Sequence, residues 1–138
     1  MQLTRRDALS LGLGAAALAL VPLRVSAAAT EEIAAFTGGA TPGMGGVTLT
    51  APEIAENGNT VPISVDAPGA VEIRIYADGN PTPGVAAFTF GALAGSHSAS
   101  TRIRLAGTQE VIAVARMADG SFAEARQTVK VTIGGCGG

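Results

Sequence analysis

Two stretches of this chain decide its fold, Val61-Pro62-Ile63-Ser64-Val65-Asp66 and Val71-Glu72-Ile73-Arg74-Ile75-Tyr76. In both, apolar residues occupy alternate positions, as in a β-strand that buries one face and exposes the other. Pro68 lies between them in a loop, where a missing amide donor is tolerated. The sequence therefore predicts two strands whose valine and isoleucine side chains point inward.

The same alternation recurs along the rest of the chain. It predicts five further strands, which we place at residues 47–50, 85–90, 101–105, 110–116 and 122–133. Asp119-Gly120 separates the last two and suits a tight hairpin with positive φ at both central residues. Seven short strands in roughly 90 residues are typical of an immunoglobulin-like antiparallel β-sandwich. We therefore predict an all-β fold, although the sequence lacks the Cys-Trp-Cys pattern of true immunoglobulin domains.

One short helix is predicted before the first strand. Thr30 can cap it, Glu31 and Glu32 favour its positive end, and Gly38-Gly39 can end it. Further along, the predicted strand at 110–116 contains residues 111–115, which are apolar on both faces. Such a strand is expected either inside the sandwich or against a partner protein, and the sequence leaves both open.

The first 29 residues resemble a twin-arginine-type export signal. Arg5-Arg6 is followed by an apolar run from Leu9 to Leu23 and by small residues suited to cleavage. Export by the Sec route remains an alternative. The apolar run is shorter than the ~20 residues that cross a bilayer, so a membrane anchor is disfavoured. The expected location is the periplasm.

The exported chain is acidic. Loss of residues 1–29 removes three of nine basic residues and one of eleven acidic residues, which leaves six and ten and a net charge of −4. Its only lysine is Lys130, and its arginines are scattered. Nucleic acids and anionic lipids are therefore poor partners.

The chain ends Gly134-Gly135-Cys136-Gly137-Gly138, which contains its only cysteine. Glycine adopts nearly all of backbone space, so this run is expected to be a flexible arm at residues 134–138 on a sandwich domain at 30–133. Five residues can span up to about 17 Å. The arm could therefore carry a thiol into the cleft of another protein.

A single cysteine in an exported protein implies intermolecular pairing or a reactive role. Nothing near Cys136 in the sequence activates it, because Lys130 is the nearest charged side chain and the terminal carboxylate disfavours a thiolate. The only histidine, His97, lies in a Gly/Ser segment and is interpreted as a solvated surface residue rather than a Cys/His partner.

The body of the chain shows no catalytic constellation in its sequence. Glu53, Glu56 and Asp66 are separated by proline and glycine, and we interpret them as solvated loop residues rather than an acid and base pair. The sequence contains no metal-ligand cluster and no nucleophile triad. We therefore expect a protein without catalytic residues or a bound cofactor.

The C-terminal sequence resembles the SoxY family, the sulfur-carrier subunits of the Sox sulfur-oxidising system, in which a Gly-Gly-Cys-Gly-Gly arm is the hallmark. The similarity extends over nearly the whole exported chain. It includes residues 51–58 with Val61-Pro62, residues 80–83, residues 100–104, and residues 114–115 with 119–122.

The resemblance implies a carrier and not an enzyme. In that family the cysteine matching Cys136 is joined oxidatively to thiosulfate by a haem-containing partner, and a hydrolase releases the terminal sulfone as sulfate. A sulfane dehydrogenase oxidises the remaining sulfur in some organisms. The resemblance also implies a complex with a SoxZ-like subunit, with sulfur adducts on Cys136 in place of a cofactor.

Two alternatives belong to other classes. A ubiquitin-like sulfur carrier would activate Gly138 with ATP, which conflicts with export and leaves Cys136 without a task. A structural or adhesive β-sandwich would be linked through a permanent Cys136 disulfide, whereas the disulfide of a carrier should be reversible.

Overall fold

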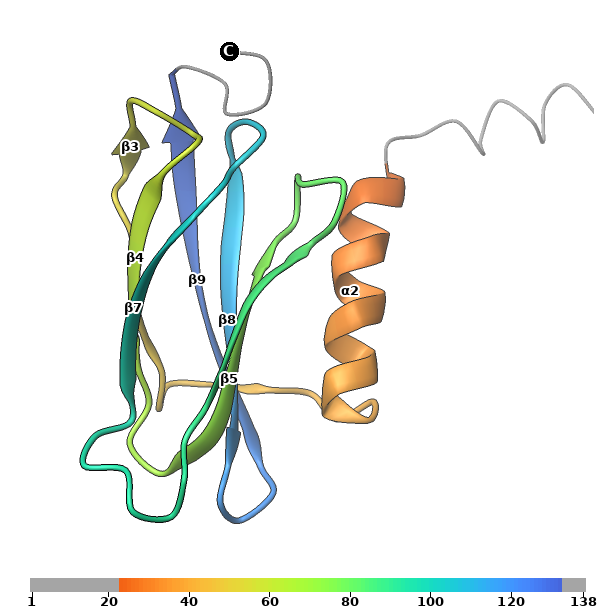
Figure 1. The fold of residues 1–138 in the computed structure, drawn as a ribbon. Coiled ribbons are helices and arrows are strands. Elements are labelled where there is room, and N and C mark those ends of the chain that lie inside the picture. The colour runs from red at the N-terminus through yellow and green to blue at the C-terminus, as the bar shows by residue number, and fades with distance from the viewer. Residues whose placement is uncertain (1–22, 133–138) are drawn as a thin grey trace, which may run out of the picture.

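The structure is a computed structural model, and it describes residues 23–132. Within this range one helix precedes nine strands, which carry the labels of Figure 1. The elements are α2 (Leu23–Thr37), β1 (Gly43–Met44), β2 (Thr48–Thr50), β3 (Ile54–Ala55), β4 (Val61–Asp66), β5 (Ala70–Ala77), β6 (Gly84–Thr89), β7 (Ser98–Ile103), β8 (Gln109–Met117) and β9 (Phe122–Val131). The two stretches that decide the fold are β4 and β5.

The strands form two sheets. The larger has the order β1-β9-β8-β5-β6, with β3 also paired to β9, and the smaller has the order β2-β4-β7. The long neighbours are antiparallel, as predicted, whereas the two-residue strands β1 and β3 run parallel to β9. The sheets face one another (Figure 1). The predicted immunoglobulin-like sandwich is confirmed.

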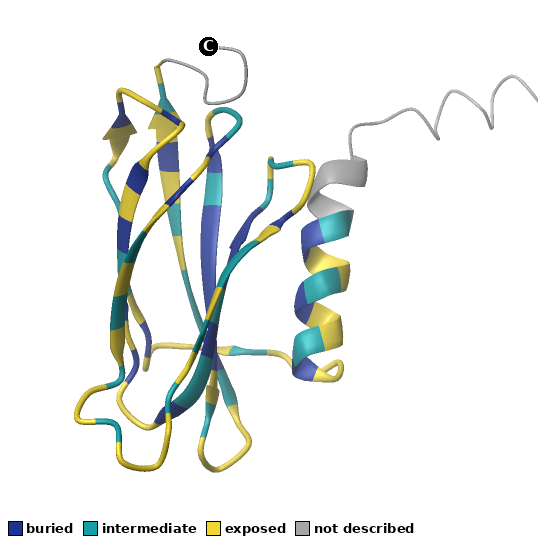
Figure 2. Ribbon diagram, viewed as in Figure 1, coloured by how far each residue is buried: buried dark blue, intermediate teal, exposed yellow. Residues whose placement is uncertain are grey.

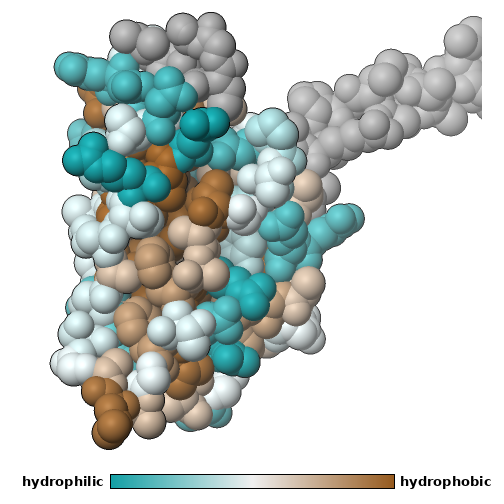
Figure 3. All heavy atoms as spheres, in the orientation of Figure 1, coloured by the Kyte–Doolittle hydropathy of each residue, from teal (hydrophilic) through white to brown (hydrophobic). Residues whose placement is uncertain are grey.

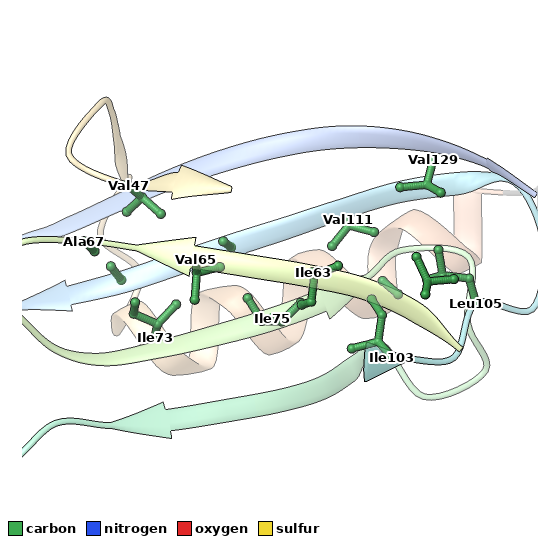
Figure 4. Close-up of a cluster of buried hydrophobic side chains, with 14 of the residues drawn as sticks. Val47, Ile63, Val65, Ala67, Ile73, Ile75, Ile103, Leu105, Val111 and Val129 are labelled. Atoms are coloured by element: carbon green, nitrogen blue, oxygen red, sulfur yellow. The ribbon is translucent and has the colours of Figure 1, made fainter. Parts of the chain in front are cut away.

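The core lies between the two sheets. β4 contributes Val61, Ile63 and Val65, and β5 contributes Ile73 and Ile75, all at most 3% exposed. Figure 4 shows the side chains of Ile63, Val65, Ile73 and Ile75 in one cluster with those of Ile103, Leu105 and Val111, and Val61 belongs to the same cluster. The period of two therefore predicted these five inward residues correctly. Val71, which was also predicted to point inward, is only partly buried, because the register of β5 against β8 shifts between Ala70 and Glu72 and Ala70 is the buried residue there.

Helix α2 covers the outer face of the larger sheet (Figures 1 and 2). Its buried residues Ala29, Ile33 and Thr37 recur every four positions, which places them on one side of the helix. Ile33 packs with Tyr76, Ile112 and Val114 of the sheet. Strand β8 is thus buried by the core on one face and by α2 on the other. The two-sided apolar pattern of residues 111–115 reflects an interior position.

The start of the helix differs from the prediction, and its end agrees with it. Thr30 lies inside α2 and is not its N-cap, because the helix is already present from Leu23 and alanines at 27–29 favour its continuation. At the other end, Gly38 and Gly39 have positive φ, and Gly39 N–H donates to the Ala34 carbonyl at 3.0 Å. This is a Schellman-type helix end.

The β8–β9 hairpin exists, but its turn type was predicted wrongly. Gly120 has φ +88°, whereas no other residue of the turn has positive φ. Met117 N–H donates to the Ser121 carbonyl at 2.8 Å, which closes a three-residue loop. A three-residue loop takes a type I turn followed by one left-handed residue.

The same turn is stabilised by a side chain. Asp119 accepts two hydrogen bonds from Ser121, and these lower the pKa of its carboxyl.

Most of the predicted strands begin and end within two residues of the observed ones, and the start of β7 differs most. β7 covers residues 98–103 instead of 101–105, since its first residues are small and polar and carry no apolar alternation. They pair with β4 through contacts such as Ser64 Oγ to Ser100 Oγ at 2.9 Å. The short strands β1 and β3 were not predicted, because two residues are too few to show a period. The last residue of the strand predicted at 122–133 lies outside the described residues.

We expect Ile33→Ala to lower the free energy of unfolding by about 2 to 3 kcal/mol, because it leaves a cavity between α2 and β8. Chemical denaturation of the exported chain measures this. Glu31→Ala, on the exposed side of α2, is the control and should stay within about 0.5 kcal/mol. Equal stability of both variants would show that α2 does not contribute to holding the sandwich together.

Candidate functional site

Strand β9 carries the chain to the predicted arm. It ends at Val131, and Thr132 is the last described residue. The predicted site residues Gly134, Gly135, Cys136, Gly137 and Gly138 lie outside the described residues. The structure therefore defines the base from which the arm departs.

One side of this base is held by strand β3. Lys130 N–H donates to the Glu53 carbonyl at 2.9 Å, and Thr132 N–H donates to the Ala55 carbonyl at 3.0 Å. These bonds extend the sheet beyond the end of the β8 ladder, whose last pair on β9 is Gln109 with Val129. The segment around Ala55 therefore holds one side of the strand that leads to the predicted arm.

The other side is held by a single side chain. The Thr108 hydroxyl oxygen accepts a hydrogen bond from Val131 N–H at 3.0 Å. Successive amides of residues 130, 131 and 132 thus bond alternately to the β3 side and to the Thr108 side. Every amide in this run therefore has a hydrogen-bond partner, which fixes the backbone at residues 130–132.

A buried polar network fixes the neighbouring loops. The Gln109 side chain is 7% exposed, accepts from Gly79 N–H at 2.8 Å, and donates to Asn80 Oδ1 at 2.9 Å. Asn80 Oδ1 also accepts from Ala106 N–H at 2.9 Å. A Cβ on Gly79 would come within 3.0 Å of Gln109, so glycine is needed for this close approach. Sequence reasoning missed Gln109, since its polar side chain carried no signal of burial.

A groove lies beside this network at the same end of the sandwich. Its volume is about 420 Å³, and its lining includes Asn80, Pro81, Thr82, Arg102 and Arg104. The segments 80–83 and 100–104, far apart in sequence, meet here. Asn80 Nδ2 donates to the Arg104 carbonyl at 2.8 Å and ties the two together.

His97 is placed at the opposite end of the sandwich. It precedes Ser98, which pairs with Asp66 at the far end of β4 from Val61. Its Nδ1 lies 2.6 Å from the Ala70 carbonyl oxygen, and its ring is 5.5 Å from that of Phe90. The expectation of a freely solvated histidine is therefore wrong, because the side chain is half-buried and hydrogen-bonded.

The three acidic residues considered in the sequence are not brought together. Glu53 and Glu56 are exposed on either side of β3, whereas Asp66 lies at the opposite end of β4 and accepts from Ser98 Oγ at 2.6 Å. Among residues 23–132 no group of three or more potential metal ligands is found. Within the same range, no helix is both long and apolar enough to cross a membrane.

A second hollow lies between α2 and β6. Its volume is about 550 Å³, and it is lined in part by Glu32, Arg74 and Tyr76. Arg74 is already bonded to Glu72 at 2.7 Å and stacked over the Phe36 ring at 4.3 Å. Burial raises the pKa of the Tyr76 hydroxyl. These groups stabilise the helix–sheet contact.

The family model for the sulfur oxidation protein SoxY matches residues 33–136. Among solved structures, the sulfur carrier protein SoxY from Chlorobium limicola f thiosulfatophilum is similar, with 36% identity and a TM-score of 0.64. The match covers 75% of this chain and 96% of that chain. A search of curated proteins finds no match.

Two superoxide reductases share the fold alone. The neelaredoxin from Ignicoccus hospitalis has 16% identity and a TM-score of 0.56, over 63% of this chain and 80% of that one. A putative superoxide reductase from Thermotoga maritima has 18% identity and a TM-score of 0.54, and the match covers 71% of this chain and 91% of that chain. The family match, in contrast, spans most of the sequence and a solved member shares more than a third of the aligned residues. The chain belongs to the SoxY family of sulfur carrier proteins, which act in sulfur oxidation.

Proposed function

We propose that this protein carries sulfur substrates covalently on Cys136 during thiosulfate oxidation. The observation that supports this most directly is the extent of the family match, which runs from residue 33 to Cys136 itself. Cys136 is the only thiol of the chain, and it follows the end of β9 by five residues. The glycines at 134, 135, 137 and 138 form the carrier arm.

The proposed cycle contains one oxidation and one hydrolysis. Thiosulfate and the Cys136 thiol join to form Cys–S–S–SO₃⁻, which releases one proton and two electrons to a haem-containing partner. Water then cleaves the terminal S–S bond and yields a persulfide on Cys136 and hydrogen sulfate. A sulfane dehydrogenase oxidises the persulfide sulfur. The partners supply the oxidant, the base and the metal, and this chain supplies the attachment point.

The contrast between base and arm suits this role. The amides at the end of β9 are hydrogen-bonded alternately to both sides up to Thr132. The glycine-rich sequence that follows is expected to change its backbone conformation easily, because glycine has no side chain. Cys136 is four residues past Thr132, so its thiol can move up to about 14 Å from the base. Tethering also keeps the intermediate at a high local concentration near each visiting enzyme.

A SoxZ-like subunit is the proposed stable partner, with the periplasm as the location after twin-arginine export of residues 1–29. A hydrophobic band between β7 and β5 supports a protein partner (Figure 3). Phe88, Phe90 and Ala99 are partly exposed along this side of the core. Strand β6 at the sheet edge also carries no charged residue, and unprotected edges favour pairing with another chain.

The carrier role predicts a reductant-labile adduct on Cys136. We expect the protein isolated from cells growing on thiosulfate to show added sulfur or thiosulfonate mass that reductant removes. Intact-mass spectrometry measures this, and Cys136→Ser is the control that should show none. A stable Cys136-linked homodimer without any adduct would instead support a structural β-sandwich joined by a disulfide.

The arm is predicted to require glycine for access and not for folding. Gly135→Val adds a branched side chain next to Cys136, and we expect turnover with all purified partner enzymes to fall severalfold because the arm fits narrow clefts less well. Thermal denaturation should be unchanged. Turnover equal to that of the unmodified protein would contradict the proposed role of Gly135.

The base of the arm is predicted to depend on Thr108. Thr108→Val removes the acceptor of Val131 N–H, and losing a hydrogen bond of about 1 kcal/mol should speed exchange of that amide roughly fivefold. Amide hydrogen exchange at Val131 measures this. Thr128→Val, an exposed substitution on the same strand, is the matched control. Unchanged protection at Val131 would show that β3 alone holds the base.

A further inference from the structure

The groove at the arm end of the sandwich carries positive charge without an ionic partner. Arg102 and Arg104 are both exposed and line it. The arginines at 74, 116 and 126 each pair with a glutamate. In contrast, no carboxylate of residues 28–132 lies within ion-pair distance of Arg102 or Arg104, and the guanidinium of Arg102 donates only to the Thr60 hydroxyl at 3.2 Å.

The groove is held in shape by the buried network. Asn80 bonds the Arg104 carbonyl and Ala106 N–H, and Gln109 bonds Asn80 in turn. The backbone that carries Arg104 is therefore fixed while its guanidinium stays free to bind. Two unpaired arginines that line one groove of a net-acidic chain form a local site of positive charge. Such a site suits an oxyanion, because each guanidinium group offers paired hydrogen-bond donors in one plane.

The groove lies within reach of Cys136. Thr108 is bonded to Val131 at 3.0 Å, and Ala106 in the groove lining is two residues from Thr108, at most about 8 Å away along the chain. Cys136 lies five residues beyond Val131, a span of up to about 17 Å. The arm is therefore long enough to bring its sulfur to the groove.

We propose that this groove receives the negatively charged sulfonate end of the adduct on Cys136, with Arg102 and Arg104 as the binding residues. The inference rests on the proposed carrier function and adds a resting position for the loaded arm. Exposed arginine–anion contacts are weak, so the loaded arm leaves the groove readily when an enzyme binds it. While it is docked, its S–S bonds are shielded from stray thiols.

The adduct can be made without any partner enzyme. Tetrathionate reacts with the Cys136 thiolate to give Cys–S–S–SO₃⁻ and releases one thiosulfate, which balances atoms and charge. A neutral adduct of similar linkage is made with methyl methanethiosulfonate, which leaves Cys–S–S–CH₃ and releases methanesulfinate. The two adducts differ in the charged group that the groove would bind.

The test compares how fast dithiothreitol removes each adduct, followed by intact mass on the full exported chain. We expect Arg102→Gln/Arg104→Gln to lose the sulfonate adduct about three to ten times faster than the unmodified protein, with high salt abolishing the difference. The methyl adduct should be lost at equal rates. Arg116→Gln, an exposed arginine on β8 at the far hairpin, is the control and should behave as unmodified protein.

Each outcome decides the inference separately from the carrier role. Faster loss confined to the sulfonate adduct of the double variant supports the groove. Equal loss of the sulfonate adduct, or a change shared with the methyl adduct, overturns it and leaves the carrier role intact. If protein from thiosulfate-grown cells bears no adduct, the carrier role fails, while the tetrathionate experiment still shows whether the groove binds the sulfonate.

Discussion

The antiparallel pairing of β8 with β9 is the interaction on which the rest of the structure depends. It runs from Gln109 with Val129 to Arg116 with Phe122. β8 is buried on one face by the core and on the other by α2, so it contributes side chains to both hydrophobic clusters, as β5 does. β9 is fixed to this strand up to Val129, and β3 and Thr108 bond to its amides from there to Thr132.

The fold itself does not determine the function. Similar sandwiches occur in superoxide reductases at 16% and 18% identity, which shows that one scaffold serves unrelated chemistry. What distinguishes this chain is how its last strand ends. Ala55 on one side and Thr108 on the other hold the backbone up to Thr132, and after Ile133 the sequence changes to the glycine-rich run at 134–138. A fixed base followed by a glycine-rich sequence is what the proposed covalent carrier requires.

The polar interactions at this end have two different roles. The buried pair Gln109 and Asn80 satisfies loop amides and carbonyls that would otherwise be costly to bury, so it stabilises the loops. The exposed pair Arg102 and Arg104 forms no ion pair with residues 28–132 and contributes no such stability. Arginines kept unpaired on an acidic chain are available for an anion from outside the folded body.

The sequence by itself determined the sandwich, the inward residues of β4, Ile73 and Ile75 of β5, and the end of the helix at Gly38-Gly39, because period-two burial and glycine conformation are local properties. The bulge that replaces Val71 by Ala70 in the core gave no such local signal. It also indicated the family, since the arm motif is short and contiguous. Only the tertiary structure decided that α2 covers β8, that β3 and Thr108 hold the base of the arm, and that residues 80–83 meet 100–104 in a groove. These contacts join residues distant in sequence, and two-residue strands or a buried glutamine carry no periodic signal from which pairing could be predicted.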